Sequence, residues 1–378
     1  MTRIYDYIII GGGLAGLQLA LKFGTDRFFE QKSVAIIDPL KKNSNDKTWC
    51  FWEEGPGEWD HLVAKTWNKG MFITSKKNID LDLDPYKYKM VRSIDFYQYA
   101  LSILKELPNF TFLHENVTTI DEASSMVYTS KNSYNSLHIF DSRINGQYLE
   151  DKNSSTLFQH FKGWYITTPE NSFDPEVFTM MDYRLKYNNT TSFIYVLPLS
   201  KNKALIEYTF FTPDMKGKEV YDGKIKEYIR EILKIDSYKI DENEEGVIPM
   251  TDFPFHKDTK TKITKIGTGG SWVKSSTGYS FKNTGKKVDQ IIDNIKKGNN
   301  PATNLINKKH RWYDSIFLNV LVERNDLGED IFTKLYSRNE PREIFKFLDE
   351  ETSQTADIKI MFSLFHLQFL KAFFKKTF

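Results

Sequence analysis

Hydrophobic and polar residues follow two different periods at the N-terminus of the chain. Residues 5–10 form a short run of aromatic and β-branched residues, which is the composition of a buried parallel strand. Residues 14–23 continue as an apolar helix, and residues 34–37 form a second strand-like run. A glycine-rich turn separates the first strand from the helix. This order predicts the first unit of a parallel α/β sheet.

The same patterns recur along most of the chain. Further strands are predicted at residues 111–114, 136–140, 192–197, 203–211 and 262–267, and helices at residues 93–106, 222–233 and 286–297. Strands dominate the middle of the chain, between about residues 150 and 255. This distribution indicates a strand-rich unit placed between two parts of an α/β domain.

The tail has a different pattern. Residues 356–378 are apolar on most of the circumference of a helix and basic at the end, with one narrow polar stripe at Lys359, Ser363 and His366. Two interpretations stay open. The segment is a final core helix, or it is a helix that lies on a membrane surface with its lysines at the headgroups.

The glycine turn near the N-terminus matches GxGxxG. Gly11 permits a tight turn, Gly13 lets the backbone approach a pyrophosphate, and Gly16 lets helix and strand pack closely. Leu14 and Ala15 stand in the first turn of the helix, where unpaired N–H groups and the helix dipole favour a negative charge. We therefore predict that this turn binds a dinucleotide.

Two further features bear on which dinucleotide binds. Asp38 ends the second strand, 22 residues after Gly16, which is close to the spacing of a ribose-binding acid. A second cluster of small residues precedes the helix predicted at 286–297. It contains the cofactor-binding candidates Gly267, Gly269, Gly270, Thr277, Gly278 and Tyr279. Backbone N–H groups in such loops suit a ribityl phosphate and the edge of a flavin, so the pair of clusters favours FAD over NAD.

These observations predict an α/β protein with a Rossmann-type FAD-binding domain in two parts, a glutathione-reductase-like fold. We expect its first part over residues 1–150, with a variable segment around 45–90, and its second part over residues 256–300. An inserted β-sheet domain for substrate and catalysis is expected over residues 151–255. Residues 301–378 are expected to form a C-terminal helical region, with membrane contact as one of its two interpretations.

Composition narrows the classes of function. The 52 Lys and Arg residues nearly balance the 50 Asp and Glu residues, which argues against a nucleic-acid-binding protein. One cysteine, Cys50, excludes an intrachain disulfide, and the seven histidines show neither HxxxH nor HExxH spacing, so no metal site is predicted. Aromatic residues make up 15% of the chain, a load that suits contact with something large and apolar.

The apolar stretch at residues 8–23 is broken by three glycines and lacks a basic leader and a small-residue cleavage site. No run reaches the eighteen or so apolar residues needed to span a bilayer. We therefore expect a cytoplasmic protein that touches the inner face of the cell membrane from that side.

Several segments carry a resemblance to a known family. They are residues 46–52 (DKTWCFW), 181–184, 193–198, 205–209, 246–250 and 267–279. With the N-terminal glycine turn before them, these segments resemble the lycopene cyclase family of flavoproteins, and the bacterial β-cyclases most. The resemblance covers about residues 5–297, whereas the last eighty residues match nothing. Ser275 departs from the proline expected at that position.

The resemblance implies an FAD-dependent lycopene β-cyclase, an intramolecular lyase or isomerase of carotenoid biosynthesis. Such an enzyme folds the acyclic ψ-ends of lycopene into β-ionone rings, which gives γ-carotene and β-carotene. It needs reduced FAD, and NAD(P)H serves only to keep the flavin reduced. The partners implied are a carotenoid dissolved in lipid and the cytoplasmic membrane surface.

Cyclisation needs an acid beside an alkene, and Glu207 is the candidate. It stands in a strand-like run of apolar and aromatic residues, where burial would raise its pKa and keep it protonated. A lone Glu in a strand is otherwise a solvated residue, and the resemblance decides between the two. Asp182 and Arg184 form an ion pair or orient Glu207. Glu244 matches a family acid and is expected to support the catalytic acid rather than to act itself.

The 46–52 block supplies cofactor and substrate candidates. Lys47 and Trp49 are expected at the cofactor. The expected lining of a substrate tunnel is aromatic, namely Trp49, Phe51, Trp52, Trp164 and Tyr195. Ring faces stabilise a nearby cation by about 0.5–2 kcal/mol each when they are desolvated.

Two other functions stay open. A flavin-dependent monooxygenase or hydroxylase acting on an apolar substrate would usually carry an Asp after the first glycine of the late loop, where this chain has Thr268. A non-catalytic flavin or carotenoid carrier would keep the glycine loops but would need no buried acid. Oxygen and NADPH consumption, and the effect of changing Glu207, separate these functions from a cyclase.

Overall fold

The structure is a computed structural model and describes residues 4–377. Its first layer is a seven-stranded sheet with the order β8-β2-β1-β11-β10-β9, to which β17 adds by pairing with β11. The strands are β1 (Ile4–Ile10), β2 (Val34–Ile37), β8 (Phe110–Leu113), β9 (Val117–Asp121), β10 (Met126–Thr129), β11 (Ser133–Asp141) and β17 (Ile263–Lys265). Strand β1 runs parallel to β2 on one side and to β11 on the other.

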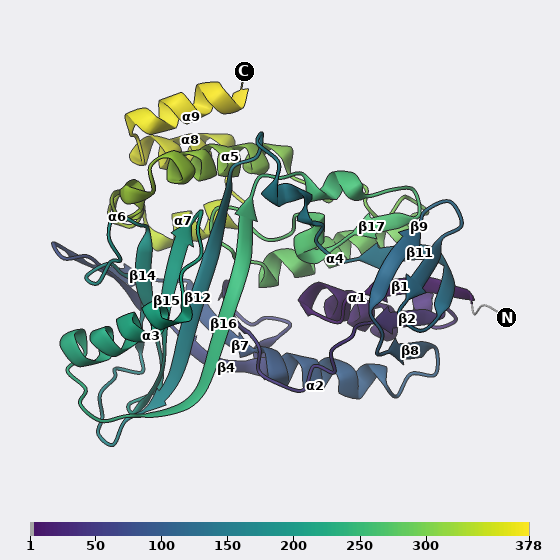
Figure 1. Cartoon of the computed structure of the whole chain (residues 1–378), viewed down its shortest axis with the longest axis horizontal. Helices are drawn as coiled ribbons and strands as arrows, with labels where there is room; N and C mark the ends of the chain where they lie inside the picture. The colour runs from purple at the N-terminus through teal and green to yellow at the C-terminus, as the bar shows by residue number, and fades with distance from the viewer. Residues whose placement is uncertain (1–3, 378) are drawn as a thin grey trace.

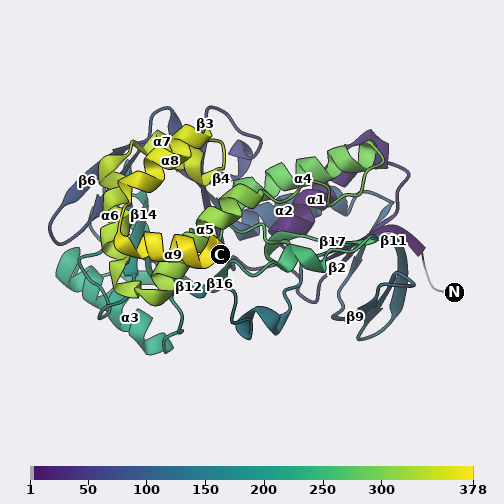
Figure 2. The same ribbon diagram turned by 90° about the horizontal axis from the view of Figure 1, so that it is seen from above.

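The N-terminal pattern folds as its apolar residues predict. Ile8, Ile9 and Ile10 are buried because both faces of the parallel sheet are covered. The helices α1 (Leu14–Thr25), α2 (Ser93–Leu104) and α4 (Phe281–Lys296) pack on the face that contains Ile9, whereas Ile8 and Ile10 pack with residues of β9, β10 and β11. Helix α4 corresponds to the helix predicted at 286–297 and begins five residues earlier than the apolar periodicity indicated. It packs beside α1 (Figure 2).

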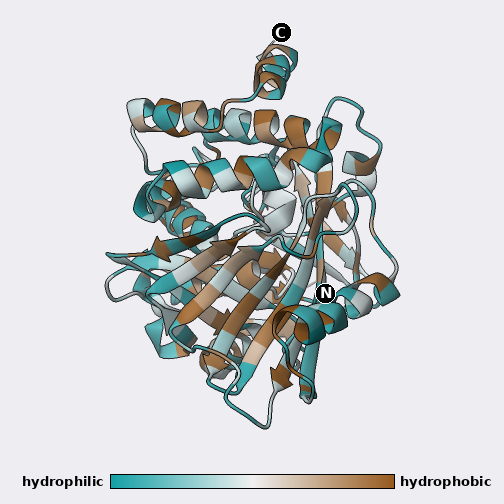
Figure 3. Cartoon of the chain, turned by 90° about the vertical axis from the view of Figure 1, so that its left-hand side faces the viewer, coloured by the Kyte–Doolittle hydropathy of each residue, from teal (hydrophilic) through white to brown (hydrophobic). Residues whose placement is uncertain are grey.

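A second seven-stranded sheet has the order β16-β12-β15-β14-β13-β5-β6. Its strands are β5 (Lys69–Ile73), β6 (Asn78–Asp82), β12 (Thr156–Thr167), β13 (Val177–Asp182), β14 (Ser192–Ser200), β15 (Lys203–Thr212) and β16 (Lys239–Thr251). Long antiparallel strands cross this half of the molecule (Figure 1), and hydrophobic residues form bands across them (Figure 3). The strands β12 and β16, missed as strands by the sequence analysis, are among the longest.

Alternate residues of the second sheet face two different layers. One face packs against α3 (Lys218–Glu227), and a π-helical turn, Tyr228–Ile232, continues from that helix. The other face packs against the C-terminal helices and contributes to the largest apolar core. Along each strand, successive side chains therefore alternate between the layer of α3 and the layer of the C-terminal helices.

The segment around 45–90 divides between two sheets. A three-stranded sheet of order β3-β7-β4 holds β3 (Thr48–Glu54), β7 (Tyr86–Arg92) and β4 (Val63–Trp67). Strands β5 and β6 pair at the edge of the second sheet, although the sequence analysis assigned this segment to the nucleotide-binding domain. The two sheets are thus tied together by the chain between residues 48 and 92.

The C-terminal region is helical. It contains α5 (Lys308–Glu323), α6 (Gly328–Arg338), α7 (Pro341–Leu348), α8 (Gln354–Ser363) and α9 (Leu367–Thr377). The prediction of one continuous tail helix is wrong, because α8 ends at Ser363 and α9 is a separate helix that packs on α5. Within residues 4–377, no helix is long and apolar enough to cross a membrane.

Short 3₁₀ turns complete the fold at Arg27–Phe29, Asp60–Leu62, Gly146–Leu149, Phe255–Asp258, Gly267–Gly270 and Asn325–Leu327. One of these turns and the loop after it matter for the site. The turn at Gly267–Gly270 follows β17 directly, and the loop from residue 271 to 280 leads from it into α4. This arrangement brings the second glycine cluster beside the first.

Candidate functional site

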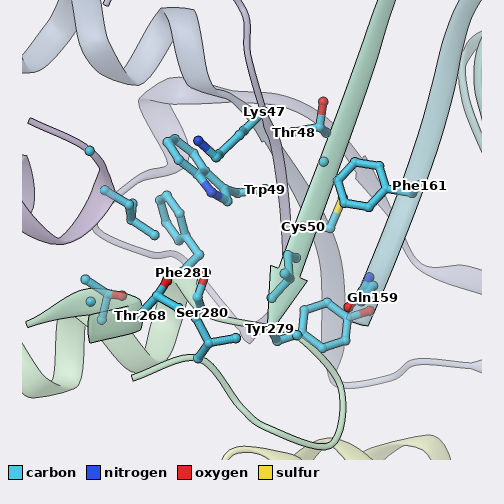
Figure 4. A pocket seen from close by; sticks show the side chains of 18 of the residues that line it. Lys47, Thr48, Trp49, Cys50, Gln159, Phe161, Thr268, Tyr279, Ser280 and Phe281 are labelled. Carbon is cyan, nitrogen blue, oxygen red and sulfur yellow. The ribbon is translucent and has the colours of Figure 1, made fainter. Parts of the chain in front are cut away.

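A cavity of about 370 Å³ lies where the two sheets meet, within the size range of ligand sites in proteins. One side consists of the glycine turn at the start of α1 and the loop before α4. The other side consists of β3 and of strands β12, β14, β15 and β16 of the second sheet. Figure 4 shows lining side chains from several of these segments, among them Trp49 on β3, Phe161 on β12 and Tyr279 in the loop before α4.

The first glycine turn has open space where a pyrophosphate would need it. Gly11 has a φ of +100°, and a Cβ on Gly16 would lie 1.9 Å from the carbonyl oxygen of Gly11, so turn and helix need both glycines. A Cβ on Gly13 would meet no protein atom within 4 Å. No side chain caps α1, and Leu14 and Ala15 line the cavity with Gly13 and Gly16. The turn therefore offers free N–H groups at an open surface.

Asp38 holds this turn in place. Its Oδ2 accepts a hydrogen bond from the Gly12 N–H at 2.6 Å, and its Oδ1 accepts one from the Leu40 N–H at 2.7 Å. The Nζ of Lys42 lies 3.4 Å from the same carboxylate. Asp38 is not among the residues that line the cavity, so its expected contact with a ribose stays a prediction.

The second glycine cluster divides into two groups. Gly267 has a φ of +58° and lines the cavity. A Cβ on Gly269 would lie 2.4 Å from the Arg143 carbonyl oxygen, and one on Gly270 would lie 2.4 Å from the Lys265 carbonyl oxygen. Gly269 and Gly270 are buried behind the lining. Close packing against the protein's own backbone thus explains why both positions need glycine.

The loop before α4 presents polar atoms without partners. Thr277, Gly278 and Tyr279 line the cavity, and Gly278 has a φ of +79°. The buried Thr277 Oγ1 and the buried Oε1 of Gln159, on β12, have no hydrogen-bond partner among residues 4–377. Since buried polar atoms are normally paired, these two atoms suit a polar ligand in the cavity. Ser280, at the start of α4, does not cap that helix either.

A buried ion network fixes the same loop. The Nζ of Lys274 lies 3.1 Å from Asp314 on α5 and 3.2 Å from Glu350 after α7. The Lys274 and Asp314 side chains are both less than a tenth exposed. The C-terminal helical region therefore anchors one wall of the cavity.

Two carboxyl groups enter the cavity from the second sheet. Gly163 on β12 stands directly opposite Glu207 on β15 and directly opposite Glu244 on β16. Directly opposed residues share a face of the sheet, so both glutamates point to the cavity side. Thr209 Oγ1 donates to Glu207 Oε1 at 2.6 Å, and Thr48 Oγ1 donates to Glu244 Oε2 at 2.6 Å.

The surroundings favour a protonated acid. Burial raises the pKa of Glu207 well above its usual range, and the charge of Glu244 raises it further, against the hydrogen bond from Thr209. Burial also raises the pKa of Glu244, and the hydrogen bond from Thr48 opposes that shift. Glu207 is thus able to carry a proton into a largely apolar cavity.

Asp182 and Arg184 lie elsewhere. Asp182 is fully buried at the end of β13, where the Nη2 of Arg184 lies 2.6 Å away and the hydroxyl of Tyr228 donates to it at 2.7 Å. Neither residue lines the cavity. The ion pair ties β13 to the π-helical turn, and no contact links it to Glu207.

The expected aromatic tunnel is only partly present. Trp49 and Tyr195 line the cavity, with Lys47 exposed at its edge. Phe51 and Trp52 are core residues that stack on other rings, Phe281 at 4.7 Å and Phe345 at 4.5 Å between centroids. Trp164 points away from the cavity into the core beneath α3, because it is one residue out of phase with Gly163.

Several lining residues escaped the sequence analysis as site candidates. They are Thr48, Tyr88, Gln159 and Phe161. Gly163, which stands between the two glutamates in the sheet, also escaped it. A glycine inside a strand often marks the close approach of another group. The glycine at position 163 could therefore have indicated that other side chains approach the strand there. Thr48 was visible inside the DKTWCFW block. Its Oγ1 also lies 2.6 Å from the Tyr165 hydroxyl.

Comparison with known proteins identifies the family. The family described as "Lycopene cyclase protein" matches residues 6–373. The chain therefore belongs to the lycopene cyclase family, and the match extends through the C-terminal helices, where the sequence analysis found no resemblance. No curated protein matches the chain in a direct search.

Solved structures share the fold at low identity. A flavoprotein/dehydrogenase from Cytophaga hutchinsonii is 13% identical, with 95% of this chain and 99% of that chain covered and a TM-score of 0.62. A geranylgeranyl bacteriochlorophyll reductase-like protein from Thermoplasma acidophilum is 11% identical, with 100% and 97% covered and a TM-score of 0.60. The p-nitrophenol 4-monooxygenase from Pseudomonas putida is 14% identical, with 99% of both chains covered and a TM-score of 0.57. The predicted fold class, an α/β flavoprotein fold with a Rossmann-type FAD-binding domain, is confirmed.

Proposed function

We propose that this member of the lycopene cyclase family is a lycopene β-cyclase. It would convert acyclic ψ-ends of lycopene into β-ionone rings, giving γ-carotene and then β-carotene, with no net oxidation or reduction. The observation that carries the proposal is the Glu207 side chain, which lines the same cavity as the two glycine turns and has a raised pKa. A general acid in such a position accelerates a proton transfer by roughly 10²–10⁴.

The cavity residues fit FAD. The open surface at Gly13 and the uncapped start of α1 suit the pyrophosphate. The unpaired Thr277 Oγ1 and Gln159 Oε1 suit the polar groups of a flavin or its ribityl chain. When bound in its reduced state, FAD supplies an electron-rich ring that stabilises positive charge. NAD(P)H is the proposed source of that reduced state.

The reaction we propose is an acid–base isomerisation. The Glu207 O–H bond breaks as its proton forms a C–H bond at the terminal alkene of the ψ-end. The electron pair of a neighbouring double bond closes the six-membered ring, and a proton then leaves a ring carbon to give the new double bond. One proton enters and one leaves, so substrate and product are isomers and no electrons are exchanged.

The other cavity side chains would protect the cation. Trp49, Phe161, Tyr195 and Tyr279 present ring surface to the cavity. Desolvated rings contribute about 0.5–2 kcal/mol each to a nearby cation. They also exclude water, which would otherwise capture the cation as an alcohol.

The substrate class leads to a proposal on location, namely the inner face of the cell membrane. Large apolar side chains are exposed along α8 and α9, which lie at the outer edge of the helical region (Figure 1). Their exposed fractions lie between 44% and 70% at Phe362, Phe365, Leu367 and Leu370. Lys371 is exposed on the same helix as two of them. An amphipathic surface of this kind suits the headgroup region of a bilayer.

Product analysis under air and without oxygen tests the function. Flavin-loaded protein, lycopene in liposomes and NADPH should give ring-closed isomers of unchanged mass, without oxygen uptake. A product heavier by oxygen, with NADPH consumed in step, would instead identify a hydroxylase. Tight lycopene binding without conversion, and no effect of Glu207→Gln, would identify a carrier.

A further inference from the structure

We propose that Glu207 and Glu244 act as one carboxyl pair that holds a single shared proton across Gly163, with Glu244 as the positioning residue. The inference deepens the proposed function and rests on it, because it assigns the partner of the catalytic acid. The two glutamates are neighbours neither in the sequence nor in the sheet. Strand β12 lies between their strands.

Gly163 makes the contact possible. Neighbouring strands lie about 4.8 Å apart, so backbones separated by one strand are roughly twice that distance apart. A Cβ on Gly163 would lie 3.4 Å from Glu207 Cβ, 3.4 Å from Glu244 Cγ and 2.8 Å from Leu205 Cδ1. The space above this glycine is therefore the space through which the two side chains approach each other. A larger side chain at this position on β12 would occupy that space.

The contact itself requires a proton. The two side chains converge over Gly163, where an added Cβ would lie 3.4 Å from Glu207 Cβ and from Glu244 Cγ, and the charge of Glu244 raises the pKa of Glu207. Ionised carboxylates can only accept hydrogen bonds, so a hydrogen bond between two carboxyl groups needs one of them protonated. Thr209 occupies Oε1 of Glu207 and Thr48 occupies Oε2 of Glu244, which leaves one oxygen of each for the partner.

The surroundings assign the proton to Glu207. The Thr48 hydroxyl and the positive charge of Arg92 both favour the ionised form of Glu244, whereas the negative charge of Glu242 disfavours it. Arg92 also pairs with Glu242 at 2.8 Å, which limits that opposition. No cation in the described part of the chain acts on Glu207. Its titratable neighbours besides Glu244 are Cys50, Tyr195 and Tyr279, whose pKa values burial raises, so they stay neutral.

This asymmetry has a consequence for the reaction cycle. The charge on Glu244 keeps Glu207 protonated to a higher pH than burial alone would allow. Once Glu207 has given its proton to the alkene, two carboxylates face each other at close range. That state favours recapture of a proton, so the pair is also the base that takes the ring proton back. The proton count of the enzyme is then unchanged after each turnover.

The pH dependence of cyclisation tests the pair. Activity requires protonated Glu207, so it should fall as the pH rises through the pKa of that group. Glu244→Gln removes the neighbouring charge and should move this alkaline limb to lower pH by at least about one unit. Gly163→Ala should shift it in the same direction, because its methyl group separates the carboxyl groups. Glu245→Gln is the control, since Glu245 is the next residue on β16 and pairs with Lys218.

Infrared titration provides a reading without turnover. The flavin-loaded wild-type protein should show one protonated-carboxyl band that disappears as the pH rises and is altered in both Glu207→Gln and Glu244→Gln. Unchanged bands and an unshifted alkaline limb in Glu244→Gln would overturn the pair even if cyclisation is intact. Failure of the wild type to cyclise lycopene would overturn the proposed function, while the infrared result would still decide whether the two carboxyl groups share a proton. If Glu244→Gln does not fold, Gly163→Ala and the wild-type titration decide it.

Discussion

Replacement of Glu207 by Gln should abolish most of the cyclisation while leaving the fold and the cofactor site intact. The amide has almost the shape of a protonated carboxyl group. Its oxygen can accept the 2.6 Å hydrogen bond from Thr209, and its NH₂ group can donate to Glu244 in place of the carboxyl proton. What the variant lacks is a proton acidic enough to transfer to an alkene.

The magnitude follows from these contacts. Because both hydrogen bonds have a replacement, the free energy of unfolding should change by less than about 1 kcal/mol. The rate should fall by at least about 10², the contribution expected from a general acid. Glu207→Asp keeps an acidic proton but withdraws it by one methylene, and a displacement on the order of 1 Å can itself cost about 10². Both variants should be poor, with Gln the poorer.

The assay is cyclisation of lycopene by flavin-loaded protein without oxygen, with products separated by chromatography. Flavin content from the absorbance spectrum and the thermal midpoint are measured on the same samples. Thr209→Val is a useful companion, because it removes the hydroxyl contact with Glu207 and leaves the carboxyl group. Wild-type turnover in Glu207→Gln, at normal flavin content, would refute the assignment of Glu207 as the acid.

Three further predictions concern the cofactor site, the loop anchor and the tail. Gly13→Ala should change the free energy of unfolding of the flavin-free protein by no more than about 0.5 kcal/mol and reduce flavin binding at least about tenfold. Gly16→Ala should lower both stability and flavin binding, because its Cβ would lie 1.9 Å from a carbonyl oxygen. Equal stability of the two variants in thermal melts would contradict this prediction. Lys274→Met should destabilise the protein by about 3–5 kcal/mol, since the buried Asp314 and the partly buried Glu350 lose their cation. The loss should be smaller at low pH, where those acids are protonated, and a melting temperature unaffected at neutral pH would refute the anchor. The double variant Phe362→Ser and Leu367→Ser should bind anionic liposomes about tenfold or more weakly at unchanged flavin content; undiminished sedimentation with liposomes would exclude this surface as the membrane contact.

Local patterns explain which parts of the fold were predictable. The strand at residues 34–37 was placed at its observed bounds, and the first strand within one residue. Their apolar runs are bounded by turns and are buried on both faces, so no distant partner is needed to recognise them. The sheet to which the segment at 45–90 belongs was not predictable, because strands β5 and β6 join a sheet whose other strands come from much later in the chain.

The tail shows how tertiary contacts override periodicity. Its apolar pattern continues without a break, yet α8 ends at Ser363. There Asn339 donates to the Ser363 hydroxyl at 2.8 Å, and Arg338 donates to the Ser363 carbonyl oxygen at 2.8 Å. Both donors stand at the end of α6 and compete with continuation of the helix. The segment alone does not contain this information.

The candidate site shows the same limit at the level of single residues. The resemblance to the family selected Glu207, but which of its neighbours shares its face depends on the register of β12 against two strands far away in sequence. That register places Gly163 between the glutamates and turns the adjacent Trp164 to the opposite face. A shift of one residue would reverse both, so the tunnel assignment of Trp164 lay beyond the reach of sequence patterns.

In the proposed reaction, reduced flavin supports cyclisation without being consumed. The decisive experiment reduces the bound flavin once, removes the reductant and oxygen, and adds lycopene in several-fold excess over protein. A reaction without net redox change should give many ring-closed products per flavin, while the flavin spectrum stays that of the reduced state. Conversion that stops at one product per flavin, with the flavin oxidised in proportion, would contradict it.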